Sequence, residues 1–189
     1  MALSPIALCA RALIKIGATA LSSFDDGTAE AEVARNLYGS TRDALLSAHP
    51  WTFATAQASL PRLVAAPVAD YRYAFQLPTD FLRALSAGSG AAGRGLDYRI
   101  ADRRLQCDAD AVILTYIYRP DEGAFPPFFD QALIARLAAE FCLPLTESTS
   151  RAEALAGVAE DEFRRAKSID SQQDVPGRIE DFTLIGARL

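Results

Sequence analysis

Residue types that commonly carry out chemistry are few in this sequence, and their spacing matches no known catalytic pattern. His49 is the only histidine. It has no partnered nucleophile in the sequence and directly precedes Pro50, which favours a structural role over general-base catalysis. Cys9, Cys107 and Cys142 are odd in number and far apart, whereas a zinc site needs close pairs of ligands. We therefore expect buried free thiols, no metal, no cofactor and no enzymatic activity.

Two further patterns could bind a cation or a phosphate. Asp25–Asp26 and Asp108–Asp110 could ligate calcium, but the ligand spacing of a calcium loop is absent, and aspartate is also favoured in tight turns. The glycine-rich segment 88–95 is similar to a phosphate-binding loop. However, neither Gly-Lys-Ser/Thr nor a Rossmann spacing between strand and helix follows it. The sequence therefore predicts turns at the aspartates and a flexible hairpin tip at the glycines.

Composition and charge indicate a globular chain without a strongly basic face. Half of the 189 residues are hydrophobic and 23% are charged, enough to build the core of one ordinary domain. The formal charge of −5 argues against a dedicated nucleic-acid binder. It is compatible with a channel wall past which DNA slides without strong phosphate contacts. No apolar run approaches the ~20 residues of a membrane span, and we expect neither a signal peptide nor a membrane partner.

Four helices and a β insertion are predicted to position these residues, which makes the fold class α+β. Ser4 caps a first helix that Gly17 ends. Thr28 caps a second helix, which ends before Pro50 because the residue before a proline avoids helical geometry. Gly39 weakens the middle of that second helix and could break it. Together the four helices are expected to form a bundle.

The other two helices follow the β insertion. Alternating aromatic and β-branched residues predict three to five short strands in one antiparallel sheet at about 68–119. A third helix starts after Phe125–Pro127 and is expected to end at Pro144. A capping box of Ser150 and Glu153 starts the fourth. Residues 1–169 are thus expected to form one domain.

Four arginines make the β insertion locally basic. One interpretation is that they contact DNA in a channel or an acidic neighbouring ring, and the other is that their charges protect a solvated sheet edge. No aromatic residues that look exposed are interleaved with them, as they would be in a single-strand platform, which favours edge protection or a protein contact. These residues are Arg94, Arg99, Arg103 and Arg104.

The C-terminal segment 170–189 is predicted to be an extended tail in the isolated subunit. Its first residues are polar and cannot bury much, but the following stretch is too apolar to be simply solvated. It either packs on its own domain or becomes ordered on a partner, which would provide a large contact. The candidate docking residues are Arg178, Ile179, Phe182, Leu184, Ile185 and Leu189.

Four segments taken in order resemble the tail tubular protein A family, adaptors that form a ring beneath the portal of tailed bacteriophages. They are His49–Ala54 (HPWTFA), Tyr73–Arg83 (YAFQLPTDFLR), Tyr116–Pro120 (YIYRP) and Phe125–Asp130 (FPPFFD). Each motif is short, and their succession along roughly the first 165 residues carries the resemblance. The glycine-rich segment and its arginines match no family motif, and neither does the tail.

The resemblance implies a structural function. The chain would assemble into a ring, with twelve copies expected, that joins the portal to a tail nozzle or stopper protein and continues the DNA channel without sequence-specific binding. It would be assembled in the bacterial cytoplasm and reside in the neck of the virion. Pro50, Trp51 and Phe53 would form a structural corner, and the tail would reach the portal or a neighbouring copy. The alternative is a small helical regulatory module that docks a partner through its tail.

Overall fold

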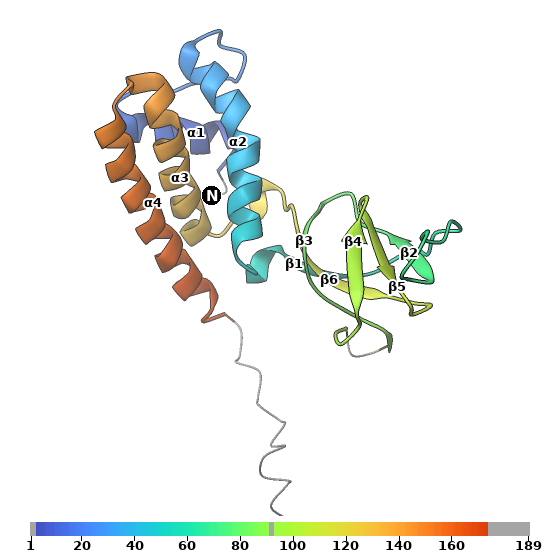
Figure 1. The fold of residues 1–189 in the computed structure, drawn as a ribbon. Helices are drawn as coiled ribbons and strands as arrows, with labels where there is room; N and C mark the ends of the chain where they lie inside the picture. The colour runs from blue at the N-terminus through green and yellow to red at the C-terminus, as the bar shows by residue number, and fades with distance from the viewer. Residues whose placement is uncertain (1–2, 91–92, 174–189) are drawn as a thin grey trace, which may run out of the picture.

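The computed structural model describes residues 3–90 and 93–173 and shows an α+β fold with helices at one end and strands at the other (Figure 1). Three of the helices pack against the remaining one, α3. Two short 3-10 helices, η1 (Thr52–Ala54) and η3 (Glu122–Ala124), lie where the chain passes between the two ends. The four long helices are α1 (Pro5–Ile16), α2 (Ala29–Ala48), α3 (Pro127–Thr146) and α4 (Thr149–Asp170).

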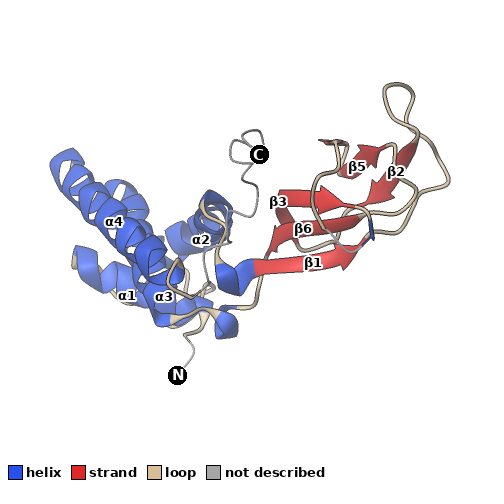
Figure 2. Ribbon diagram, turned by 90° about the horizontal axis from the view of Figure 1, so that it is seen from below, coloured by secondary structure: helices blue, strands red, loops and turns tan. Residues whose placement is uncertain are grey.

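The strands form two three-stranded antiparallel sheets, where the sequence predicted one sheet (Figure 2). The first sheet has the order β1 (Thr55–Ser59), β6 (Ile113–Tyr118), β3 (Phe81–Gly88). The second has the order β2 (Tyr73–Gln76), β5 (Arg104–Cys107), β4 (Tyr98–Ala101). β1 begins before residue 68, the predicted start of the insertion. Its sequence, TAQAS, lacks the aromatic and β-branched alternation of a typical strand, and backbone pairing with β6 holds it in place.

The first two helices begin and end where the sequence predicted. The hydroxyl of Ser4 accepts a hydrogen bond from the amide of Ala7, and that of Thr28 accepts one from Ala31, both at 3.2 Å. Gly17 ends α1 in the left-handed conformation, with φ of 74°. α2 is continuous to Ala48, so no break occurs at Gly39.

Two boundaries differ from the prediction. α3 continues through Pro144 to Thr146. Pro144 has no amide hydrogen to donate to the carbonyl of Glu140, so the helix lacks one hydrogen bond there and ends two residues later. In this last turn the hydroxyl of Thr146 donates to the carbonyl of Cys142 at 2.7 Å. α4 begins at Thr149 with Ser148 as its cap, so the predicted capping box at Ser150 lies one residue inside the helix.

Separate apolar cores stabilise the two ends of the molecule. The helical core is centred on buried side chains of α1 and α3 and includes Cys9 and Cys142. The second core lies between the two sheets and includes Cys107. All three cysteines are buried free thiols, as predicted. Burial raises the pKa of the Cys9 thiol to about 12, so it stays protonated at neutral pH.

Gly88 should be the least replaceable glycine among those of the described residues. A Cβ at this position would lie 2.2 Å from the backbone nitrogen of Arg94, whereas a Cβ at Gly39 on α2 meets nothing within 4 Å. We predict that Gly88→Ala lowers the free energy of unfolding by about 1–3 kcal/mol through overpacking. The matched control Gly39→Ala should raise it by about 0.5–1 kcal/mol. Urea denaturation measures both, and equal effects would contradict the close approach at Gly88.

Candidate functional site

Trp51 is the centre of the junction, the region where the helices meet the first sheet. Its side chain is fully buried, and its indole Nε1 donates a hydrogen bond to the carbonyl of Leu45 at 3.1 Å. Its ring lies edge-on to Phe129 and Phe163, with centroids 5.2 and 5.8 Å away. Phe53 packs against Phe129 at 5.0 Å. Two of the resembling segments, His49–Ala54 and Phe125–Asp130, therefore form one aromatic cluster, beside which Pro50 is exposed.

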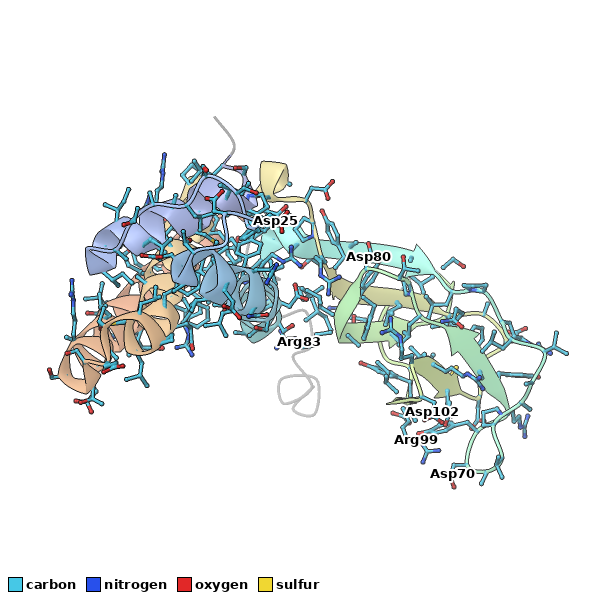
Figure 3. All side chains as sticks on the ribbon, turned by 90° about the horizontal axis from the view of Figure 1, so that it is seen from above. Asp25, Asp70, Asp80, Arg83, Arg99 and Asp102 are labelled. Atoms are coloured by element: carbon cyan, nitrogen blue, oxygen red, sulfur yellow. The ribbon has the colours of Figure 1, made fainter. Side chains whose placement is uncertain are left out.

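The other two resembling segments reach the same junction through hydrogen bonds. The hydroxyl of Tyr118 donates to the carbonyl of Phe53 at 3.3 Å. Asp80 accepts twice from the segment Tyr116–Pro120: its carbonyl oxygen from the Arg119 amide at 2.9 Å and its carboxylate from the Tyr116 hydroxyl at 3.4 Å. In Figure 3, Asp80 and Arg83 lie on the helix-facing side of the strands. Each of the four segments that carry the sequence resemblance thus contributes residues to this region, although Tyr73–Gln76 forms β2 in the second sheet.

A charged cluster connects α2 to the chain that leaves β6. One oxygen of Glu122 accepts hydrogen bonds from the hydroxyl of Tyr38 and from Arg42, each at 2.8 Å. Arg119 donates its Nε to Asp43 at 3.0 Å. Burial alone would raise the pKa of Glu122, but hydrogen bonds from its own backbone, Tyr38 and Arg42 outweigh it and hold that pKa below its usual range. This cluster fixes α2 relative to the start of α3.

A buried carboxylate joins the last residue of α4 to the start of η1. Asp170 is 3% exposed and accepts hydrogen bonds from the amide of Thr52, at 3.1 Å, and from its hydroxyl. His49 places its Nε2 3.6 Å from the same carboxylate, and burial lowers the pKa of His49 although Asp170 opposes this. The carboxylate thus lies between threonine and histidine, whereas nucleophile activation needs the histidine in the middle. We interpret the trio as a structural clamp.

The sequence prediction missed this clamp because Thr52 and Asp170 are 118 residues apart. It also placed Asp170 at the start of the extended tail, which is wrong: Asp170 is buried in α4, and the described chain continues to residue 173. An isolated aspartate at the end of an amphipathic helix resembles any solvated residue, and only the tertiary contact identifies it. The docking residues predicted in the tail, from Arg178 to Leu189, lie outside the described residues.

The four predicted contact arginines do not act as a set. Arg99 on β4 is engaged within the chain, because it pairs with Asp70 at 2.8 Å and donates to Gln106 at 2.9 Å. Figure 3 places Asp70, Arg99 and Asp102 together at the end of the strands away from the helices. Arg103 and Asp102 form the turn between β4 and β5, with positive φ values of 56° and 50°. Within residues 3–90 and 93–173, no ion pair involves Arg94, Arg103 or Arg104.

Two arginines of the β end, Arg62 and Arg99, lie beside half-buried tyrosine rings. The guanidinium of Arg62 lies 4.2 Å from the ring centre of Tyr73, and that of Arg99 lies 5.6 Å from that of Tyr71. The sequence did not reveal these pairs because their members come from different strands or loops. In each pair the arginine lies over a ring face that a base would need for stacking, so the arrangement favours intramolecular cation–π contacts over a nucleic-acid platform.

The candidate ion-binding residues are engaged in turns. Asp26 accepts hydrogen bonds from the amides of Ser23 and Ser22, at 2.9 and 2.8 Å, and these bonds lower its pKa. Asp108 accepts one from the Arg72 amide at 2.9 Å. In the part of the chain that the structure describes, no three histidine, cysteine or acidic side chains converge on a metal position. After the glycine-rich segment the chain returns to β3, where the amide of Leu96 donates to the carbonyl of Ala87 at 3.0 Å.

Comparison with known proteins gives no independent assignment: no protein-family model matches the chain, and no curated protein matches its sequence. Among the described helices, none is long and apolar enough to cross a membrane.

Asp130 is a buried acid in the first turn of α3 and belongs to the resembling segment Phe125–Asp130. It is 7% exposed, and its Oδ1 has no hydrogen-bond partner. Burial raises the pKa of the Asp130 carboxyl to about 6, although the positive charge of Arg11 opposes the rise. The folded state therefore holds this proton more tightly than the unfolded state, whose aspartates titrate near pH ~3.9.

The stability contribution of Asp130 should decline as pH rises. It is fully present below about pH 3.9 and is lost as pH rises through about 6, because the native carboxyl must then ionise while buried. We predict that Asp130→Asn raises the free energy of unfolding by about 1–3 kcal/mol near pH 7.5, with little change near pH 4. Urea denaturation at both pH values measures this. Asp161→Asn, at an exposed position on α4, is the control. If the free energy of unfolding of Asp130→Asn had the same pH dependence as that of the wild type, the raised pKa of Asp130 would be contradicted.

Proposed function

We propose that this chain is a structural head-to-tail adaptor of a tailed bacteriophage. In this proposal it forms a ring of about twelve copies that joins the portal to the next tail component, a nozzle or a stopper protein, and continues the DNA channel. The protein resides in the neck of the virion after assembly in the bacterial cytoplasm. It is a structural component of the virion that carries out no catalysis and binds no cofactor.

One observation carries the proposal: the four segments that resemble the tail tubular protein A family converge on the junction. Trp51, Phe53 and Phe129 share the aromatic cluster, and Asp80 is bonded to the segment around Arg119. Tyr116–Pro120 and Phe125–Asp130 are close in sequence, whereas Phe53 and Asp80 reach them from distant parts of the chain. Their convergence supports their interpretation as parts of one structural unit, the corner of an adaptor subunit.

Within this proposal the helical end is a four-helix bundle that forms the body of the ring, and the sheets reach toward neighbours or the distal component. The tail is extended in the free subunit and becomes ordered against the portal or an adjacent copy, through the apolar residues Phe182, Leu184, Ile185 and Leu189. The absence of a strong basic balance supports a channel that DNA crosses without being held. Arg94, Arg103 and Arg104 remain candidates for contacts with neighbouring rings.

The proposal predicts separate effects for two truncations. A chain ending at Gln173 keeps Asp170 and should melt like the full-length protein, but it should fail to join the portal. A chain ending at Ser168 loses the carboxylate that binds Thr52 and should be less stable by about 1.5–3 kcal/mol. Thermal melting measures the stability of each chain.

Negative-stain imaging of each chain mixed with its portal protein measures assembly. The full-length protein should be monomeric or weakly associated alone and should form rings on the portal. Full-length protein that never forms rings would contradict the adaptor proposal. If the chain ending at Gln173 formed rings normally, the tail would not be the docking element.

A further inference from the structure

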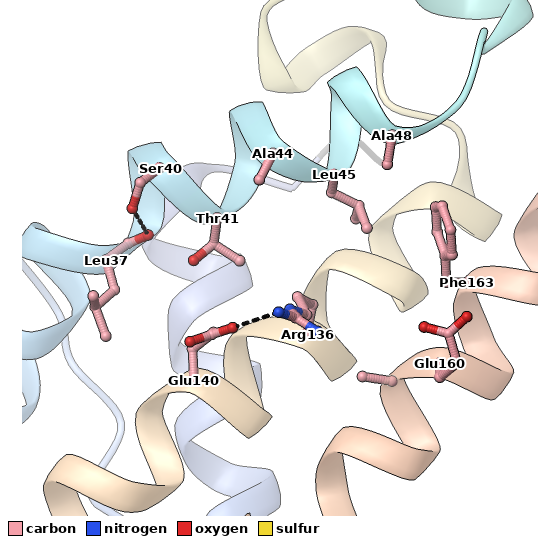
Figure 4. A pocket seen from close by; sticks show the side chains of 11 residues that line it. Leu37, Ser40, Thr41, Ala44, Leu45, Ala48, Arg136, Glu140, Glu160 and Phe163 are labelled. Atoms are coloured by element: carbon pink, nitrogen blue, oxygen red, sulfur yellow. Dashed lines mark hydrogen bonds and ion pairs between the residues drawn. The ribbon is translucent and has the colours of Figure 1, made fainter.

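The helical end carries an open groove between α2 and α4, with α3 as its floor (Figure 4). α2 and α4 each pack on α3 and leave a space of about 410 Å³ between them. The α2 side includes the small residues Ala44 and Ala48 beside Leu37 and Leu45, and Phe163 lies on the α4 side. On the floor, Arg136 and Glu140 form an ion pair at 2.8 Å. The groove is therefore apolar along its walls, with room for branched side chains.

The β end carries a protruding apolar loop. Residues 63–69 read LVAAPVA, seven apolar residues in succession between Arg62 and Asp70. Val64 and Val68 are each 106% exposed, the largest exposures among the large hydrophobic residues described. The loop leads into β2, on the side of the molecule away from the helices (Figure 1). Such a loop is costly to leave in water and is typical of a contact surface.

We propose that the loop 63–69 of one copy inserts into the groove between α2 and α4 of the next copy. Loop and groove lie at opposite ends of the molecule (Figure 1), so a chain cannot fill its own groove with its own loop. Their pairing is heterologous, and a repeated heterologous contact forms a ring when the rotation between copies closes on itself. The inference rests on the proposed adaptor function and specifies which surfaces hold the ring together.

Charge supports the same pairing. Residues 55–118 carry seven arginines and six aspartates, whereas residues 3–54 and 119–173 carry ten basic and fifteen acidic side chains. Near the loop, Arg62 and Arg72 are exposed and Asp70 is paired with Arg99, whereas the groove is lined by the Arg136–Glu140 ion pair and by Glu160. A slightly basic β end thus meets an acidic helical end, which favours head-to-tail association over contacts between like ends.

Cysteine cross-linking tests the contact directly. The native thiols are buried, so cysteines introduced by Val64→Cys and by Ala44→Cys in separate full-length chains can report on each other. Mixed with the portal protein under mild oxidation, these two variants should form a mixed disulfide at least about tenfold faster than Val64→Cys with Ile14→Cys, a factor that corresponds to ~1.4 kcal/mol. Ile14 is 63% exposed on α1 and does not line the groove, so it is the matched control.

The outcomes separate the possible occupants. If Val64→Cys formed disulfides with Ala44→Cys and with Ile14→Cys at equal rates, the proposal would be overturned. If Ala44→Cys cross-linked faster with Ile185→Cys than with Val64→Cys, the proposal would also be overturned, because the tail would then occupy the groove. Val64→Asp should melt like the wild type and lose ring formation on the portal. Rings formed normally by Val64→Asp would reject the loop contact and leave the adaptor function standing, whereas wild-type protein that forms no rings would reject the adaptor function itself.

Discussion

The carboxylate of Asp170 binds the amide and hydroxyl of Thr52, and the arrangement of the two ends of the molecule depends on this contact. Thr52 begins η1, which leads directly into β1, and Asp170 ends α4. A carboxylate that is 3% exposed is costly to bury unless it is well hydrogen-bonded. Its bonds to Thr52 offset that cost only when the last helix and the first strand are both in place. The clamp therefore couples the helices to the sheets.

The aromatic cluster and the charged cluster act on the same region from different sides. Trp51 fills the space beneath the clamp, and its indole is hydrogen-bonded to Leu45, so a buried polar atom is satisfied within an apolar cluster. On the α2 side, Glu122 and Arg119 fix the chain that returns from β6 to the helices. Both crossings between helices and sheets are thus fixed by specific bonds. In the proposed ring, such fixed geometry would favour closure, because a variable angle between the two ends would prevent it.

Local features were predictable from the sequence, and long-range contacts were not. Ser4, Gly17 and Thr28 define helix ends through their own backbone neighbours, so the first two helices were predicted correctly. β1 was missed because it is a strand only through its pairing with β6. The division into two sheets was missed because the sequence of a short strand does not indicate which strand it pairs with. At the candidate site, the resemblance implied a structural corner at Trp51, whose ring the structure shows to be buried. The contact between Asp170 and Thr52 and the arginine–tyrosine pairs form only in the folded chain, and no local sequence pattern predicts them.

Trp51 is the only tryptophan of the chain and lies in the junction, so its fluorescence reports the region on which the account depends. The most direct test is urea unfolding followed simultaneously by Trp51 fluorescence and by circular dichroism of the backbone. If the junction couples helices and sheets into one folding unit, the two transitions will coincide, and Asp170→Ala will move both to lower urea together. A fluorescence transition that precedes the loss of helical circular dichroism would contradict this account, because the junction would then open while the helices stay folded.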